Sequence, residues 1–91
     1  MKDRIQKHHE ICRGLGALYI EKNTDYGNSF GETYKDLGII SAVTRIVDKV
    51  NRLKRLSRNE NLVKDETIED TLIDLANYAI MTLIEIGLEN E

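Results

Sequence analysis

The sequence contains no proline, no tryptophan and only one phenylalanine among its 91 residues. Without proline, the chain lacks the residue that most strongly breaks helices. With so few aromatic residues, a core must be built from Leu, Ile, Val and Ala, which suits packed helices better than a small β-sandwich. The length leaves room for one domain only, residues 1–91. We therefore expect a single all-α domain.

Cysteine is also scarce, since Cys12 stands alone. One cysteine cannot form an internal disulfide, which fits a reducing compartment. The N-terminus lacks the apolar segment of an export signal, and no run approaches the roughly 18 apolar residues of a membrane span. These absences predict a cytoplasmic protein, in the cell that carries its gene, with no membrane partner.

The charge balance is acidic, with a net charge of −3 and a pI near 5.4. A surface that binds duplex DNA through phosphate contacts is normally basic, so direct DNA binding is not expected. Any site for an anion must be local.

Apolar residues recur at helical spacing in three segments, at about residues 2–22, 38–56 and 65–87. Between the first two, the stretch 23–38 is rich in Gly, Asn and Asp, which predicts a long loop with at most a short helical turn. Because a loop of that length is unusual in a small domain unless it is functional, we interpret it as a ligand loop.

The third helix carries more apolar residues than one stripe requires. Ile73, Ile80 and Ile84 lie off its main seam and would remain in water in a lone three-helix unit. We therefore expect a homo-oligomer that completes the bundle, such as an antiparallel helical dimer, with a ligand site shared between subunits.

The same helix carries a stripe of acids. Glu66, Asp70, Asp74 and Asn77 fall within an arc of about 80° at 100° per residue. Carboxylates that face partly inward suit a hard cation such as Mg²⁺. The alternative is a partly exposed acidic face paired with arginines from the second helix.

The second helix has a basic side, formed by Arg45, Lys49, Arg52 and Arg55 with Asp48 among them. Such a cluster can bind phosphate while the acid holds a metal or orients a base. Periodicity alone favours the plainer alternative, a solvated face with local ion pairs.

The expected loop gathers Lys22, Asp25, Tyr26, Asn28 and Phe30 around a glycine. An aromatic ring there can stack on a base while an amide or acid reads the polar edge of the base. The alternative is a capped turn between helices. The chain contains no P-loop, Rossmann, zincin or hydrolase-elbow motif.

Three blocks, KNTDYGNSF, RIVDKVNRLKRL and ETIEDTLIDLANYAI, together resemble a phage and prophage family, the nucleotide modification associated domain of the first type. The resemblance implies a helical fold akin to the MazG-like nucleoside triphosphate pyrophosphohydrolases, which act as oligomers with Mg²⁺ held by helix-borne acids. The family pattern singles out Lys22, Asp25, Tyr26, Gly27, Arg45, Asp48, Lys49, Arg52, Glu66, Asp70, Asp74 and Asn77.

One departure separates the chain from MazG-like enzymes, which pair an E-x-x-E on one helix with an E-x-x-D on a later one. Here the second helix offers only Asp48 among cations. Fewer acids and more cations suit holding an anionic ligand at least as well as cleaving it, because two-metal chemistry needs several carboxylates.

Three functions follow, in order of preference. The first is capture of a phosphate-bearing nucleotide or a nucleotide-derived signal without turnover. The second is Mg²⁺-dependent pyrophosphohydrolysis, with Asp48, Glu66 and Asp70 as catalytic and metal-binding residues. The third is a structural helical interaction module. The residues expected to bind the ligand are Lys22, Asp25, Tyr26, Asn28, Arg45, Lys49, Arg52, Asp74 and Asn77.

Overall fold

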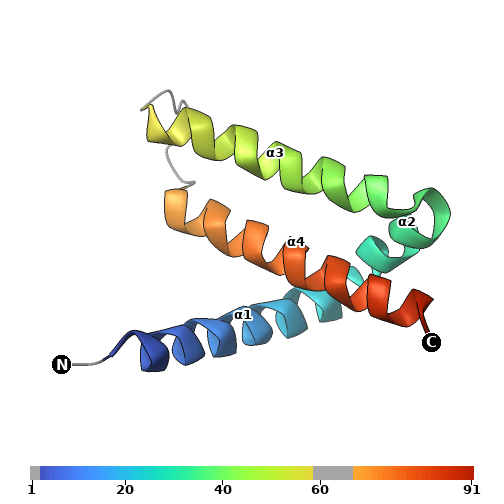
Figure 1. Ribbon diagram of the computed structural model, residues 1–91, viewed down its shortest axis with the longest axis horizontal. Helices are drawn as coiled ribbons and strands as arrows, with labels where there is room; N and C mark the ends of the chain where they lie inside the picture. The colour runs from blue at the N-terminus through green and yellow to red at the C-terminus, as the bar shows by residue number, and fades with distance from the viewer. Residues whose placement is uncertain (1–2, 59–66) are drawn as a thin grey trace.

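The computed structural model describes residues 3–58 and 67–91. Within them the chain forms four α-helices, and no strand is found in these two ranges (Figure 1). The expected all-α fold is confirmed. The helices are α1 (Arg4–Tyr26), α2 (Ser29–Leu37), α3 (Ile39–Ser57) and α4 (Ile68–Glu89).

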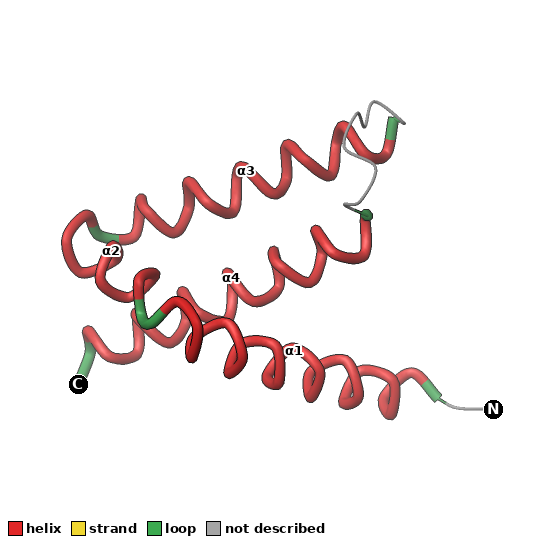
Figure 2. Tube along the Cα trace, turned by 180° about the vertical axis from the view of Figure 1, so that it is seen from behind, coloured by secondary structure: helices red, strands yellow, loops and turns green. Residues whose placement is uncertain are grey.

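Helices α3 and α4 lie side by side and run in opposite directions, as the views from both sides show (Figures 1 and 2). The short α2 closes one end of this pair. Helix α1 meets α4 near its own C-terminal end, and its N-terminal end points away from the other helices (Figure 1). Three helices thus form a packed unit, and α1 extends from it.

The core lies at the end of the bundle that α2 closes. Phe30 and Tyr34 from α2 are buried there against Ala42 of α3. Aromatic and aliphatic side chains of α4 pack around them, namely Tyr78, Met81 and Ile86. The shortest helix therefore supplies the largest buried side chains of the core.

This arrangement corrects the long loop expected at residues 23–38. Helix α1 continues to Tyr26, and α2 begins only a few residues later. Gly27 and Gly38 have positive φ angles of 69° and 78°, and each donates its backbone N–H to a carbonyl in the last turn of the preceding helix. Glycine is the usual residue for such helix ends. The glycines therefore separate helices, and Phe30 and Tyr34, one turn apart, face the core.

The apolar stripe of α1 is mostly exposed. Leu15 is buried, whereas Ile5 and Ile11 are 71% and 62% exposed. The Cα radius of gyration is 14.8 Å, above the roughly 12 Å expected for a compact chain of this length. The N-terminal half of this stripe does not pack into the core of the same chain, because that half diverges from the bundle (Figure 1).

Helix α4 begins at Ile68, and its expected start near Asp65 lies outside the described residues. Thr67 caps it: its hydroxyl oxygen accepts from the N–H of Asp70 at 3.0 Å. The Asp70 carboxylate in turn accepts from the N–H of Thr67 at 3.4 Å. This reciprocal capping box satisfies two N–H groups that helix geometry leaves unpaired.

The outer side of α4 is apolar and exposed. Ile80 and Ile84 are 42% and 40% exposed, as expected, and Leu83 beside them is 68% exposed. Ile73 is half-buried. By length and composition alone α4 could also cross a membrane, because an 18-residue window within it has a mean hydropathy of 1.4. This apolar face, Leu72, Ile80, Leu83 and Ile84, is left uncovered by the rest of the described chain.

Tyr34 makes the core sensitive to high pH. Burial raises its pKa above the ordinary value of 10, and the nearby Glu89 carboxylate, which accepts from its hydroxyl at 3.3 Å, raises it further. Because the pKa of Tyr34 is raised in the folded state, folding favours the protonated phenol. The contribution of Tyr34 to stability is therefore fully present below pH 10, the unfolded-state value, and is lost as the pH rises through the folded-state pKa. We expect the free energy of unfolding to fall between pH 10 and 11.

The variant Tyr34→Phe should show a smaller fall over the same range, because it has no phenol to ionise at this position. Urea unfolding at pH 8, 10 and 11 measures the difference. Tyr26→Phe is the matched control, since Tyr26 is 75% exposed. An equal fall in all three proteins would contradict this explanation.

Candidate functional site

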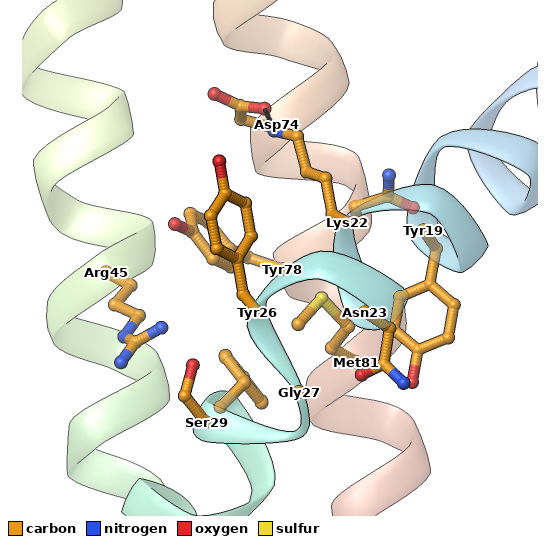
Figure 3. Close-up of a pocket in the computed structure, with 12 residues that line it drawn as sticks. Tyr19, Lys22, Asn23, Tyr26, Gly27, Ser29, Arg45, Asp74, Tyr78 and Met81 are labelled. Carbon is orange, nitrogen blue, oxygen red and sulfur yellow. Dashed lines mark hydrogen bonds and ion pairs between the residues drawn. The ribbon is translucent and has the colours of Figure 1, made fainter.

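A cavity of about 150 Å³ opens where the C-terminal end of α1 meets α2, α3 and α4 (Figure 3). All four helices contribute to its wall, so the site depends on the whole fold. The lining residues are Tyr19, Lys22, Asn23, Tyr26, Gly27, Ser29, Phe30, Arg45, Asp74, Asn77, Tyr78 and Met81.

Two walls of the cavity are each formed by four side chains from one face of a helix, and the spacing along the sequence is the same in both. On α1 the lining residues are Tyr19, Lys22, Asn23 and Tyr26, and on α4 they are Asp74, Asn77, Tyr78 and Met81. Positions i, i+3, i+4 and i+7 lie on one face of an α-helix. The cavity is therefore framed by one face of α1 and one face of α4, each mixing aromatic and polar side chains.

The inner wall is aromatic. The rings of Phe30 and Tyr78 are stacked, with centroids 6.0 Å apart and planes inclined by 17°. The guanidinium carbon of Arg45 lies 5.4 Å from the centroid of Phe30, a cation–π contact. This contact holds the guanidinium of Arg45 beside the rings, on the opposite side of the cavity from Lys22 (Figure 3).

The rim carries a carboxylate between two lysines. One oxygen of Asp74 lies 3.3 Å from Nζ of Lys22 on α1, and the other lies 3.1 Å from Nζ of Lys49 on α3. The three side chains are 29%, 52% and 24% exposed, respectively. The carboxylate of Asp74 thus links α1, α3 and α4. Lys22, Lys49 and Arg45 together place three cations around the cavity beside this carboxylate.

Asn77 fastens α1 to α4 at the base of the cavity. Its side-chain amide is buried and donates to the backbone carbonyl of Leu15 at 3.3 Å. A buried amide is costly unless it is hydrogen-bonded, so this contact fixes the crossing point of the two helices.

The structure brings together five of the nine residues expected to bind a ligand, since Lys22, Tyr26, Arg45, Asp74 and Asn77 line the cavity. Lys49 contacts Asp74 at its rim. The remaining three do not line it, namely Asp25, Asn28 and Arg52.

Asp48 and Asp70, two of the three residues expected to bind Mg²⁺, do not line this cavity. Asp48 is exposed on α3, Asp70 is held in the capping box of α4, and Glu66 lies outside the described residues. No group of three or more metal-ligating side chains is found within residues 3–58 and 67–91. The described acids therefore do not fit a two-metal centre, and the magnesium site stays a prediction.

Sequence reasoning missed several lining residues, notably Tyr78 and Met81. Their signal was present, because they stand four and seven positions after Asp74 on the same helix face. Asn23 and Ser29 were missed because the segment was interpreted as a loop rather than as two helix ends. Tyr19 was missed as well, although it stands three positions before Lys22 on the same helix face.

A second hollow, of about 570 Å³, lies between α2 and the end of α4. Three of its lining side chains are glutamates, Glu32, Glu85 and Glu89, and the cation Lys35 accompanies them. An acidic lining repels phosphate. For an anionic ligand the smaller cavity is therefore the better site, despite its size.

The sequence matches the family described as nucleotide modification associated domain 1 over residues 22–86. The chain belongs to this family. The matched range contains every lining residue of the smaller cavity except Tyr19, so the cavity is formed by the family domain. No curated protein and no solved structure matches the chain. The kinship with MazG-like enzymes stays a prediction.

Removing the amide of Asn77 tests how the cavity is held together. We expect Asn77→Ala to lower the free energy of unfolding by about 1–3 kcal/mol, because a buried hydrogen bond to α1 is lost. The control Asn51→Ala removes an exposed amide from α3 and should change it by less than about 0.5 kcal/mol. Urea unfolding measures both values, and equal losses would show that the amide does not anchor α1.

Proposed function

We propose that this protein binds a phosphate-bearing nucleotide or nucleotide-derived signalling molecule in the smaller cavity and holds it without cleaving it. The observation that carries this proposal is the combination of an aromatic wall with a cationic rim in one cavity. A nucleotide has the matching halves, a flat ring and a charged phosphate.

The aromatic half of the cavity fits a base. Phe30 and Tyr78 form the inner wall, and Tyr26, which is 75% exposed, stands at the opening. Stacking on such rings stabilises a bound base by about 1–3 kcal/mol. The volume of about 150 Å³ is below the roughly 300–1,000 Å³ of pockets that enclose a whole ligand. The base would enter, and the phosphates would stay at the rim.

The cationic half fits phosphate. Lys22, Lys49 and Arg45 surround the cavity from α1 and α3, while the chain as a whole is acidic. Lysine and arginine both bind phosphate oxygens through charge-assisted hydrogen bonds. A local excess of cations on an acidic protein favours a bound anion over a general nucleic-acid surface.

The balance of charge supports capture over hydrolysis. The acid that lines the cavity, Asp74, is engaged by two lysines, and a metal would have to displace them before it could bind this carboxylate. The pyrophosphohydrolase would instead need Asp48, Glu66 and Asp70 to converge, and Asp70 is occupied at the helix cap. Capture requires only the residues that the cavity already brings together.

Isothermal titration against nucleoside triphosphates, cyclic dinucleotides and ADP-ribose derivatives tests the proposal, with Mg²⁺ and with chelator, followed by chromatography of the recovered ligand. We expect tight binding in chelator and recovery of intact ligand. Conversion to a monophosphate only with Mg²⁺ would establish the pyrophosphohydrolase instead. Absence of binding by every compound would overturn both functions and favour a structural module.

With the ligand from this panel that binds, Tyr26→Ala should weaken binding about 5- to 150-fold, because one stacking surface worth about 1–3 kcal/mol is removed. Ile20→Ala is the matched control. Ile20 is 66% exposed on α1 and does not line the cavity, so its removal should leave the affinity unchanged.

Self-association is part of the proposal. The exposed face of α4 and the diverging half of α1 together leave Ile5, Ile11, Leu72, Leu83 and Ile84 largely in water. Apolar surface of this extent usually marks an interface. Sedimentation equilibrium should give a mass above the 10.5 kDa monomer, and Leu83→Glu should lower it. A monomer that instead co-floats with phospholipid vesicles would show that a membrane covers this face.

A further inference from the structure

Asp74 lies between two lysines at the rim of the cavity. Its two oxygens lie 3.3 Å and 3.1 Å from the ammonium nitrogens of Lys22 and Lys49. A phosphate group presents two oxygens at a spacing close to that of a carboxylate, and the same cations recognise both. In the described structure, the carboxylate of Asp74 already binds both lysines at the rim of the cavity.

We infer that Asp74 is an internal competitor for this cation pair. Phosphate binds between Lys22 and Lys49 and displaces the carboxylate, so Asp74 sets how strongly an anion must bind to enter. This inference rests on the proposed function, because it assigns the phosphate position of the same site. It also gives Asp74 a role opposite to that of a ligand-binding residue, since its charge opposes the ligand.

The geometry allows this exchange. Lys22 is 52% exposed, so its flexible side chain can turn toward the opening without moving α1. Lys49 and Asp74 are only 24% and 29% exposed, so their charges act on each other with less screening by water than two fully exposed groups would. A multiply charged phosphate competes well for two ammonium groups, whereas a single carboxylate on a small metabolite does not. The cation pair therefore selects for phosphate esters and diphosphates.

The test uses inorganic pyrophosphate as the probe, which needs no base pocket. Asp74→Asn keeps the size of the side chain and removes its charge. We expect this variant to bind pyrophosphate at least about fivefold more tightly than the wild type in isothermal titration, because a partly buried like charge next to the ligand is removed. Adding Lys22→Gln to Asp74→Asn should abolish the gain.

The control Asp36→Asn makes the same change in net charge at an exposed position on α2, away from the cavity. It should change the affinity by less than about twofold, since water and salt screen an exposed charge outside the cavity. Equal or weaker binding by Asp74→Asn than by the wild type would overturn the inference and show that Asp74 contacts the ligand or only holds the helices.

The outcome is separate from that of the proposed function. If Asp74→Asn gains affinity for pyrophosphate but no nucleotide binds the wild type, the anion position stands and the nucleotide assignment fails. A second measurement, made on the wild-type protein, tests the inference even if Asp74→Asn does not fold. In the wild type, the carboxyl ¹³C signal of Asp74 should move on addition of pyrophosphate while that of Asp36 does not. A signal that stays in place would also overturn the inference.

Discussion

The ion pairs of Asp74 are the contact on which the arrangement of the site depends. They join α1, α3 and α4 at one point, and that point is the rim of the cavity. Partly exposed ion pairs contribute little to stability, commonly below about 1 kcal/mol each. Their importance here is positional, because they hold two ammonium groups from different helices next to the same opening. A packed apolar contact could join the helices equally well, but it would not leave charge there.

The long helices were predictable from the sequence, and so was the meeting of their polar stripes. Arg45, Asp74 and Asn77 were chosen from helical periodicity and Lys22 from the expected loop, and all four line one cavity. Helical spacing made the grouping on α3 and α4 predictable, because it determines which side chains share a face. The prediction did not require knowledge of the angles between helices, since a small bundle brings inward-facing polar groups close together.

The segment after α1 was not predictable in the same way. Its density of Gly, Asn and Asp is typical of a loop, yet Gly27 and Gly38 each end a helix, and the core aromatics lie between them. Local composition cannot distinguish a loop from two helix ends and a short helix, because the same residues serve both. Asp70 shows a related ambiguity. An acid near the start of a helix can bind a metal or complete a capping box, and in the described structure the Asp70 carboxylate accepts from the N–H of Thr67.

The shape of the molecule links the exposed apolar surface to the site. Helix α1 is attached to the bundle from its middle to its C-terminal end, where Leu15 accepts from Asn77 and Lys22 pairs with Asp74, while Ile5 and Ile11 in its N-terminal half are exposed. A long helix held only through its C-terminal half can change its angle about Leu15, and such a change would move Lys22 and Tyr26 relative to Asp74 and Tyr78. A partner that covers Ile5 and Ile11 would fix the angle of α1. Self-association would therefore also order the cavity, because the same helix carries both surfaces.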